Sequence, residues 1–157
     1  LNELIKIMTK NSNLKYSILN LSNVYGPRQD PHGEAGVVSI FANKYLNKQE
    51  PIIFGDGEQT RDYIYVSDVI SALIKASKIE NNHFLNIGTG VETSVNELAN
   101  SMKTQFNSKV NAIYKPAREG ELVRSVLNNT KAKQELDWEP EYSLDEGMKE
   151  VFNWLRA

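Results

Sequence analysis

The sequence contains no cysteine, and only two of its 157 residues are histidines. The absence of cysteine excludes disulfide bridges and thiolate zinc sites, and it fits a reducing compartment, so we expect a cytoplasmic protein. His32 and His83 lie far apart in the sequence, and neither has a second residue at the spacing of metal ligands. We therefore expect no metal site.

Concentrated charge and long apolar runs are also missing. Eighteen lysines and arginines against twenty aspartates and glutamates give a net charge of -2. No stretch gathers the roughly five to eight basic residues of a nucleic-acid or membrane-surface patch, and none approaches the roughly 20 apolar residues of a membrane span. The sequence therefore predicts neither nucleic acid nor membrane as a partner.

The overall amino-acid composition is typical of one globular domain. Apolar residues make up 40% and charged residues 24% of the chain. A folded chain of this size buries about 70% of the surface that its unfolded form exposes, so we expect a single region over residues 1–157. The sequence begins with Leu1, within what reads as an amphipathic helix, and we expect it to be a piece of a longer polypeptide.

Hydrophobic periodicity and turn residues predict both helices and strands. Helices are expected at 2–11, at 37–46, from Ser67 or Asp68 to about Lys78, and at 130–136. Capping boxes formed by Ser94 with Glu97 and by Ser143 with Glu146 predict two more helices. Strands or extended segments are expected at 16–21, 52–54, 61–66, 84–87, 110–114 and 123–127. Short strands at irregular spacing indicate a mixed α/β or α+β chain without a complete doubly wound sheet.

A loop is predicted between the first strand and the second helix. Residues 22–36 show no periodicity and contain Gly26, Pro27 and Pro31. Loops of this length inside a compact domain are usually functional. We therefore expect a ligand to lie against this segment.

Two arginines on irregular backbone are candidate ligand-binding residues. Arg61 follows the glycine turn at 55–57, where its guanidinium could bind a phosphate through two parallel hydrogen bonds or form a surface pair with an aspartate. Arg118 lies in the irregular segment 116–122 with Glu121, whose carboxylate could accept hydrogen bonds from a vicinal diol, unless the segment is a solvated loop. Phe54, just before the glycine turn, is either a core residue or a platform for a base.

A second glycine turn lies between a predicted strand and a predicted helix, which is the position of a dinucleotide-binding motif. Ile87-Gly88-Thr89-Gly90 follows a predicted strand and precedes a predicted helix, but Thr93 occupies the position of the third glycine. The third glycine normally allows close packing of helix and strand. The motif therefore favours a tight strand-to-helix turn over a pyrophosphate site.

Several motifs in order resemble one known family. They are Asn23-Val24-Tyr25-Gly26-Pro27-Arg28-Gln29, the run Gly33–Phe41, Gly55–Val69, Asn86–Gly90, Arg118-Glu119-Gly120-Glu121, and Leu144-Asp145-Glu146-Gly147. Together they span nearly the whole chain and resemble the extended short-chain dehydrogenase/reductase enzymes that act on nucleotide sugars. The nearest resemblance is to the UDP-sugar 4-epimerases.

The resemblance implies a fold and a set of ligand-binding residues. The fold would be the C-terminal, UDP-sugar-binding part of an extended short-chain dehydrogenase/reductase, with most of the NAD-binding Rossmann domain absent from this chain. Asn23 would bind the diphosphate or sugar, and Val37 and Val38 would open a helix over the nucleotide. The remaining implied residues are Ile52 and Phe54 at the uracil, Arg61 and Arg118 at the diphosphate, and Glu121 at the ribose hydroxyls.

The catalytic residues implied by the resemblance are not found in this sequence. The family oxidises the sugar with NAD, using a Tyr-x-x-x-Lys pair, and here no tyrosine is followed four residues later by lysine. We therefore expect no catalytic residue in this chain, no NAD bound to it and no activity from it alone. For the intact enzyme we expect NAD, a homodimer and interconversion of UDP-glucose and UDP-galactose, or of their N-acetyl forms.

Other functions stay open at this point. The region 55–61 is shared with nucleotide-sugar dehydratases and decarboxylases, while the loop 30–36 favours an epimerase. The chain is alternatively a stand-alone nucleotide-sugar-binding module, or a remnant that folds without a function. Binding of a UDP-sugar without turnover distinguishes the module from the remnant.

Overall fold

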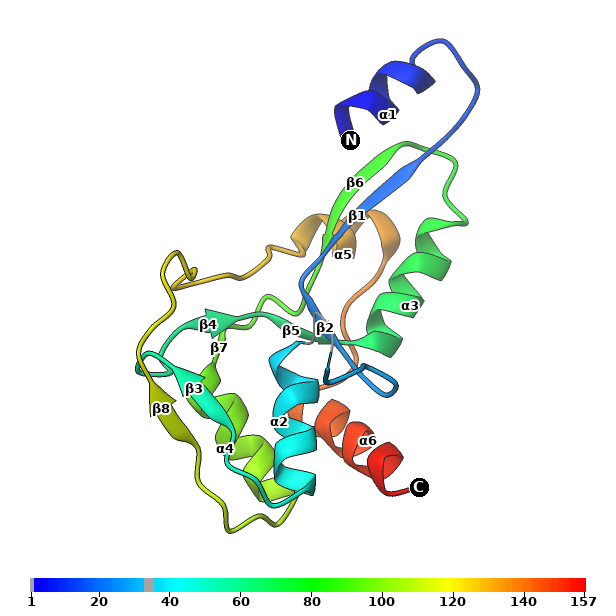
Figure 1. Ribbon diagram of the computed structural model, residues 1–157. Coiled ribbons are helices and arrows are strands. Elements are labelled where there is room, and N and C mark those ends of the chain that lie inside the picture. Colours follow the sequence, from blue (N-terminus) through cyan, green and yellow to red (C-terminus); the bar gives the residue numbers. More distant parts are fainter. Residues whose placement is uncertain (1, 33–35) are drawn as a thin grey trace.

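The computed structural model describes residues 2–32 and 36–157 and shows a mixed α/β chain, as predicted (Figure 1). The helices are α1 (Asn2–Thr9), α2 (Val37–Leu46), α3 (Val66–Ala76), α4 (Val95–Gln105), α5 (Thr130–Leu136) and α6 (Leu144–Arg156). The strands are β1 (Ser17–Leu21), β2 (Asn23–Tyr25), β3 (Ile52–Phe54), β4 (Thr60–Arg61), β5 (Tyr63–Tyr65), β6 (His83–Ile87), β7 (Thr93–Ser94) and β8 (Ile113–Lys115). Within these two ranges no helix is both long enough and apolar enough to cross a bilayer.

The strands of the described residues pair two by two. β1 pairs with β6, β2 with β5 and β3 with β8, all in parallel, while β4 and β7 are antiparallel. Only Ser22 separates β1 from β2. Its backbone N–H donates to the Ile87 carbonyl, and the N–H of Asn23 donates to the Asp62 carbonyl, each at 2.9 Å. The chain therefore passes from one partner strand to the next at Ser22, and Asn23 lies opposite Tyr63.

The expected loop at 22–36 was wrong at residues 23–25, which form strand β2. A strand of three residues is too short to show periodicity, and its partner β5 lies about forty positions further along the chain. The strand expected at 110–114 lies instead at 113–115, because pairing with β3 starts where the Ile113 N–H donates to the Pro51 carbonyl at 2.9 Å. Residues 123–127 form no regular strand, although Thr60 exchanges backbone hydrogen bonds with Val123 and Ser125.

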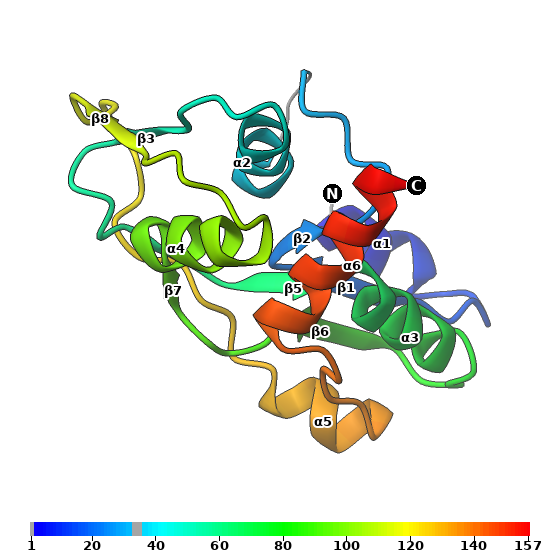
Figure 2. The same ribbon diagram turned by 90° about the horizontal axis from the view of Figure 1, so that it is seen from below.

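Two clusters of buried side chains make up the core. The first lies among α2, α4 and α6, which pack side by side (Figure 2), and it includes Phe41, Leu98 and Met148. The second includes Leu85 and Trp138 and lies among β1, β6, α3 and α5.

Strand β5 contributes to both clusters. Tyr63 and Tyr65 belong to the first cluster and Ile64 to the second, because successive side chains of a strand point to opposite faces. All three residues are almost fully buried. The strand therefore joins the two halves of the core.

Both predicted capping boxes are confirmed, at the start of α4 and of α6. The expected cap of α3 at Ser67 or Asp68 was wrong, because α3 begins at Val66 with Tyr65 as its N-cap. The Asp68 carboxylate turns inward and accepts hydrogen bonds from the backbone N–H groups of Glu141 (2.9 Å) and Tyr142 (3.3 Å). Burial raises the pKa of Asp68 despite these bonds. This side chain thus ties the segment before α6 to α3.

Helix α1 ends at Thr9, earlier than the expected Asn11. Its apolar side chains Leu4, Ile7 and Met8 are exposed, and only Thr9 is buried. In Figure 1, α1 lies at one end of the molecule, beyond β1 and β6. The helix therefore adds little to either core cluster.

Candidate functional site

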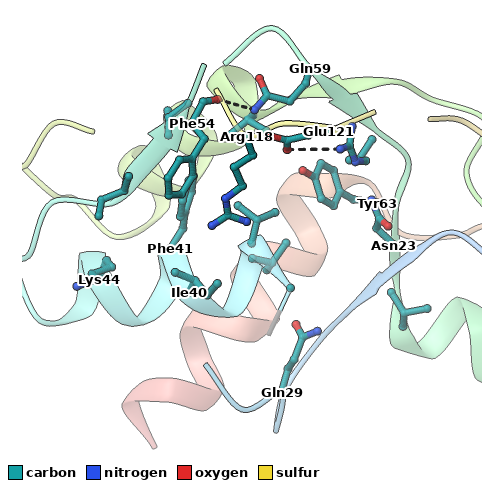
Figure 3. A pocket seen from close by; sticks show the side chains of 18 of the residues that line it. Asn23, Gln29, Ile40, Phe41, Lys44, Phe54, Gln59, Tyr63, Arg118 and Glu121 are labelled. Carbon is teal, nitrogen blue, oxygen red and sulfur yellow. Dashed lines mark hydrogen bonds and ion pairs between the residues drawn. The ribbon is translucent and has the colours of Figure 1, made fainter. Parts of the chain in front are cut away.

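The eight residues that the family resemblance nominates line a single cavity of about 660 Å³ (Figure 3). They are Asn23, Val37, Val38, Ile52, Phe54, Arg61, Arg118 and Glu121. They come from β2, α2, β3, β4 and the segment after β8. The fold therefore brings together side chains that are almost one hundred residues apart, while their roles toward a ligand stay predictions.

The aromatic wall of the cavity is Phe54, at the end of β3. The following turn is fixed by the Gln59 side chain, whose Nε2 donates to the Phe54 carbonyl at 2.8 Å. Gly57 has a φ of +78°, and a Cβ there would stand 2.1 Å from Oδ1 of Asn96, at the start of α4. The positive φ and the contact with the Asn96 side chain both favour glycine here, so the turn packs closely against the start of α4.

Arg118 is exposed, and it lines the cavity from the exposed segment that follows β8. Its guanidinium carbon lies 3.9 Å from the centre of the Phe54 ring, within the range of a cation–π interaction. The sequence left Phe54 as either a core residue or a platform. The half-buried ring lines the cavity and carries a guanidinium on one face.

Arg61, the last residue of β4, is held by hydrogen bonds within the chain. Its Nη1 donates to the carbonyls of Thr60 and Leu122, each at 2.7 Å. Its Nη2 lies 3.5 Å from Oε1 of Glu121. The ionic partner of Arg61 within the protein is thus Glu121 and not the aspartate that was one of its two predicted alternatives, while the other alternative, a phosphate, stays a prediction. An incoming anion would share the guanidinium with this carboxylate.

Helix α2 forms the floor of the cavity. Val37 and Val38 start the helix, and the lining continues through Ile40, Phe41 and Lys44, which were not among the predicted site residues. The spacing i, i+3, i+4 and i+7 from Val37 places them on one helical face, so the helical period was the signal that could have found them. Figure 3 shows them along one side of the cavity.

Polar residues of the lining, among them Gln29 and Tyr63, were also missed. Gln29, in the segment after β2, and Tyr63, opposite Asn23 on β5, both line the cavity. Gln29 stands in a loop without periodicity, and Tyr63 stands in the run Tyr63-Ile64-Tyr65, which reads as core. No local pattern distinguishes such residues from structural ones.

The cavity has an excess of positive charge. Among its described lining residues, Lys44, Arg61 and Arg118 are cations and Glu121 is the single carboxylate. Lys44 bonds to the neutral side chain of Gln49 at 3.1 Å, so its charge is not compensated there. A cavity with an aromatic wall and an excess of cations suits a ligand that has both an aromatic ring and a negative charge.

The turn at 88–90 binds a carboxylate of the protein itself. Asp62, which is 2% exposed, accepts hydrogen bonds from the backbone N–H groups of Thr89 (2.9 Å), Gly90 (3.1 Å) and Leu127 (3.3 Å). A Cβ on Gly88 would stand 2.4 Å from Oδ2 of Asp62. The glycines thus serve a tight turn, and backbone amides that a dinucleotide would need are already occupied.

The two histidines lie outside this cavity. His83 is buried at the start of β6, with Nδ1 2.5 Å from Oε2 of Glu135, and His32 is exposed. Part of the loop that favoured an epimerase, Gly33, Glu34 and Ala35, lies outside the described residues. In the ranges 2–32 and 36–157 no three His, Asp or Glu side chains form a cluster suited to a metal ion.

Comparison with known proteins decides the family. The model of a family described as GDP-mannose 4,6 dehydratase matches residues 2–151. The chain belongs to the GDP-mannose 4,6 dehydratase family. The predicted resemblance to nucleotide-sugar enzymes of the extended short-chain dehydrogenase/reductase type is confirmed.

Curated relatives of this family member include epimerases and decarboxylases. It is 51% identical over 154 residues to a Methanocaldococcus jannaschii protein described as a candidate UDP-glucose 4-epimerase, covering 98% of this chain and 50% of the relative. It is 44% identical to a UDP-glucose 4-epimerase of Mycolicibacterium smegmatis, covering 86% and 44%. A UDP-N-acetyl-alpha-D-glucosaminuronate decarboxylase of Bacillus cytotoxicus is 31% identical, covering 91% and 47%. The chain spans about half the length of these relatives.

Solved structures of UDP-glucose 4-epimerases share the fold. The Thermotoga maritima enzyme with UDP-glucose superposes with a TM-score of 0.95 at 45% identity, covering 98% of this chain and 50% of that one. The Thermus thermophilus enzyme with NAD superposes with a TM-score of 0.89 at 32% identity, covering 99% and 51%. The expected fold of a partial extended short-chain dehydrogenase/reductase is confirmed, since the match covers about half of each enzyme.

Proposed function

We propose that this chain is the nucleotide-sugar-binding half of an NAD-dependent UDP-sugar 4-epimerase. One observation carries the proposal: the eight residues nominated from the sequence converge on one cavity with an aromatic wall and an excess of positive charge. The names of the Mycolicibacterium smegmatis and Thermotoga maritima relatives support the reaction. The decarboxylase is less similar, at 31% identity, so the comparison favours the epimerase.

The distribution of aromatic and charged side chains along the cavity suits a nucleoside diphosphate bound in one orientation. The base would lie between Ile52 and Phe54, beside the floor formed by α2. The diphosphate would lie between Arg61 and Arg118, where two guanidinium groups offset the cost of removing two negative charges from water. Glu121 would then exchange part of its contact with Arg61 for hydrogen bonds from the ribose hydroxyls.

The sugar would extend past Asn23 toward the loop that contains Gln29. The chemical step requires NAD, which accepts and returns a hydride in the intact enzyme. The turn at 88–90 does not fit a dinucleotide, because Asp62 occupies its amides, so we assign NAD to residues outside this chain. What this chain contributes is binding and orientation of the UDP-sugar.

Titration calorimetry of the chain with UDP tests the proposal. We expect saturable binding of UDP and weaker binding of GDP, because a purine is larger than the uracil for which Ile52 and Phe54 are assigned. A UDP-sugar bound without turnover is the expected result for this chain alone. Absence of UDP binding would contradict the proposed function, and equal affinity for GDP would contradict the uracil assignment.

A further inference from the structure

Asn96, the second residue of α4, joins three segments of the chain through its side-chain amide. Its Nδ2 donates to the Asp56 carbonyl at 2.9 Å and to Oε1 of Glu58 at 2.7 Å. Its Oδ1 accepts a hydrogen bond from the Tyr114 hydroxyl at 2.9 Å. The amide therefore links the glycine turn after β3, and also β8, to the start of α4.

The backbone strengthens the contact between the glycine turn and α4. The N–H of Asn96 donates to the Gly57 carbonyl at 3.1 Å, and the N–H of Val95 donates to the Gln59 carbonyl at 3.2 Å. Both N–H groups belong to the first turn of α4, which has no acceptors for them within the helix. The glycine turn thus completes the start of α4.

An asparagine is the side chain that suits these partners. Its amide has two donors on the nitrogen and an acceptor on the oxygen. A carbonyl and a carboxylate face the nitrogen, while a hydroxyl faces the oxygen. An aspartate at position 96 would turn an oxygen toward the two acceptors, and a leucine would make none of the three bonds.

The segments that Asn96 joins carry two residues of the cavity wall. Phe54 directly precedes the glycine turn. Tyr114 is on β8, whose last residue Lys115 lies opposite Phe54, and Arg118 follows three residues later. Asn96 itself stands outside the described lining of the cavity. The amide therefore acts on both segments without facing a ligand.

We infer that Asn96 is a positioning residue, which holds the Phe54 ring and the Arg118 guanidinium in the arrangement that binds the nucleotide. The apparent affinity of a site falls with the fraction of molecules in the binding arrangement, so loosening the two segments weakens binding. The inference rests on the proposed function, because it takes UDP to be the ligand of the cavity.

The variant Asn96→Leu tests the inference, because it removes three side-chain bonds without changing the charge. We expect the affinity for UDP, measured by titration calorimetry on the complete chain, to fall about 3-fold to 10-fold. The midpoint of urea unfolding should change little, because Asp56, Glu58 and Tyr114 are exposed and water can replace the amide.

The proton resonances of the Arg118 side chain give a second measurement, on the chain without ligand. The guanidinium carbon lies 3.9 Å from the centre of the Phe54 ring, so ring currents should move the δ protons of Arg118 upfield in the wild type. In Asn96→Leu these resonances should move toward the values of an arginine in water. A merely structural role would change stability and leave this shift as it is.

Tyr114→Phe is a milder variant, since it removes only the bond to Oδ1 and leaves α4 unchanged. The affinity and the Arg118 shift should change in the same direction and by less. If Asn96→Leu does not fold, Tyr114→Phe decides by the same two measurements. The matched control is Asn100→Leu, at an exposed asparagine on the same helix, which should change neither quantity.

Three outcomes would overturn the inference. Equal UDP affinity of wild type, Asn96→Leu and Tyr114→Phe would overturn it while leaving the proposed function intact. A lower affinity with an unchanged Arg118 shift would show that Asn96 does not act through the cavity wall. A wild type that binds no UDP would overturn the proposed function, and the inference with it.

Discussion

At the scale of single residues, the two arginines of the cavity are held in different ways. Arg61 donates to two carbonyl oxygens and faces Glu121, so its position is fixed before any ligand binds. Arg118 is held by its contact with the Phe54 ring and lies on an exposed segment. A rigid cation and an adaptable one can together close around a diphosphate.

Replacement of these arginines should weaken UDP binding. We expect Arg61→Ala and Arg118→Ala each to cost about 1.5 to 3 kcal/mol of binding free energy, the value of a hydrogen bond to a charged group. Arg124→Ala is the control, since this arginine is exposed and pairs with Glu92 outside the cavity. Unchanged calorimetric affinity in both cavity variants would remove the diphosphate assignment.

Asp62 is the residue on which the turn at 88–90 depends. In Asp62→Asn an NH₂ group can take the place of Oδ2 and face the N–H groups of Gly90 and Leu127, so two donors would lose their acceptor. We expect a loss of about 1.5 to 3 kcal/mol in the free energy of unfolding, measured with urea. Asp56→Asn, at an exposed aspartate whose bond is local, should change stability far less. Equal stability of the two variants would show that the buried carboxylate contributes nothing.

At the scale of elements, the helices were predictable where their signals are local. A capping box spans four residues and needs no distant partner, and both boxes are present at α4 and α6. Asp68 looked like a similar cap, but its carboxylate bonds to Glu141 and Tyr142, more than seventy residues away. No local pattern contains that information.

The residues of the candidate site were likewise predictable where a local motif contains them. Motifs nominated the eight residues that the structure brings to one cavity, since motif residues are recognised without knowing their neighbours. Lys44 and Tyr63 were missed because their importance depends on which way a helix or strand faces. The pairing of β2 with β5, which places Tyr63 opposite Asn23, is a long-range contact that the sequence does not display.

The capping boxes give a prediction for helix α6. Ser143→Ala removes the acceptor for the Glu146 N–H and should lower the free energy of unfolding by about 1 kcal/mol. Because α6 carries Met148 and Val151 of the first core cluster, the loss should appear in global urea unfolding. Ser143→Asp should restore most of the stability, because aspartate also caps a helix. A larger loss in Ser143→Asp than in Ser143→Ala would contradict the capping role.

At the scale of the whole molecule, five glutamates set the response to acid. The pKa values of Glu92, Glu97, Glu135, Glu139 and Glu146 are all lowered in the folded chain. A carboxylate whose pKa is lower when folded stabilises the protein above its unfolded pKa, and this contribution disappears as the pH falls. The chain should therefore lose stability below about pH 4.5.

Glu92 provides the test of this response. Hydrogen bonds from Arg124 and Thr60 lower its pKa from 4.5 to about 2. We expect Glu92→Gln to be less stable than wild type near pH 7, with the difference shrinking as the pH falls from about 4.5 toward 2. Urea unfolding at several pH values measures this, and high salt should reduce the difference, because the Arg124 side chain is exposed. A difference that stays constant with pH would assign the effect to packing instead of charge.

Strand β5 has a consequence for how the molecule opens. Because Ile64 faces one core cluster and Tyr63 and Tyr65 face the other, neither cluster can come apart without exposing this strand. The two clusters should therefore unfold in one cooperative step. Native-state amide hydrogen exchange should give the β5 amides an opening free energy equal to that of global unfolding, while the amides of α1 exchange through local fraying. Two groups of core amides with different opening energies would show that each cluster opens on its own.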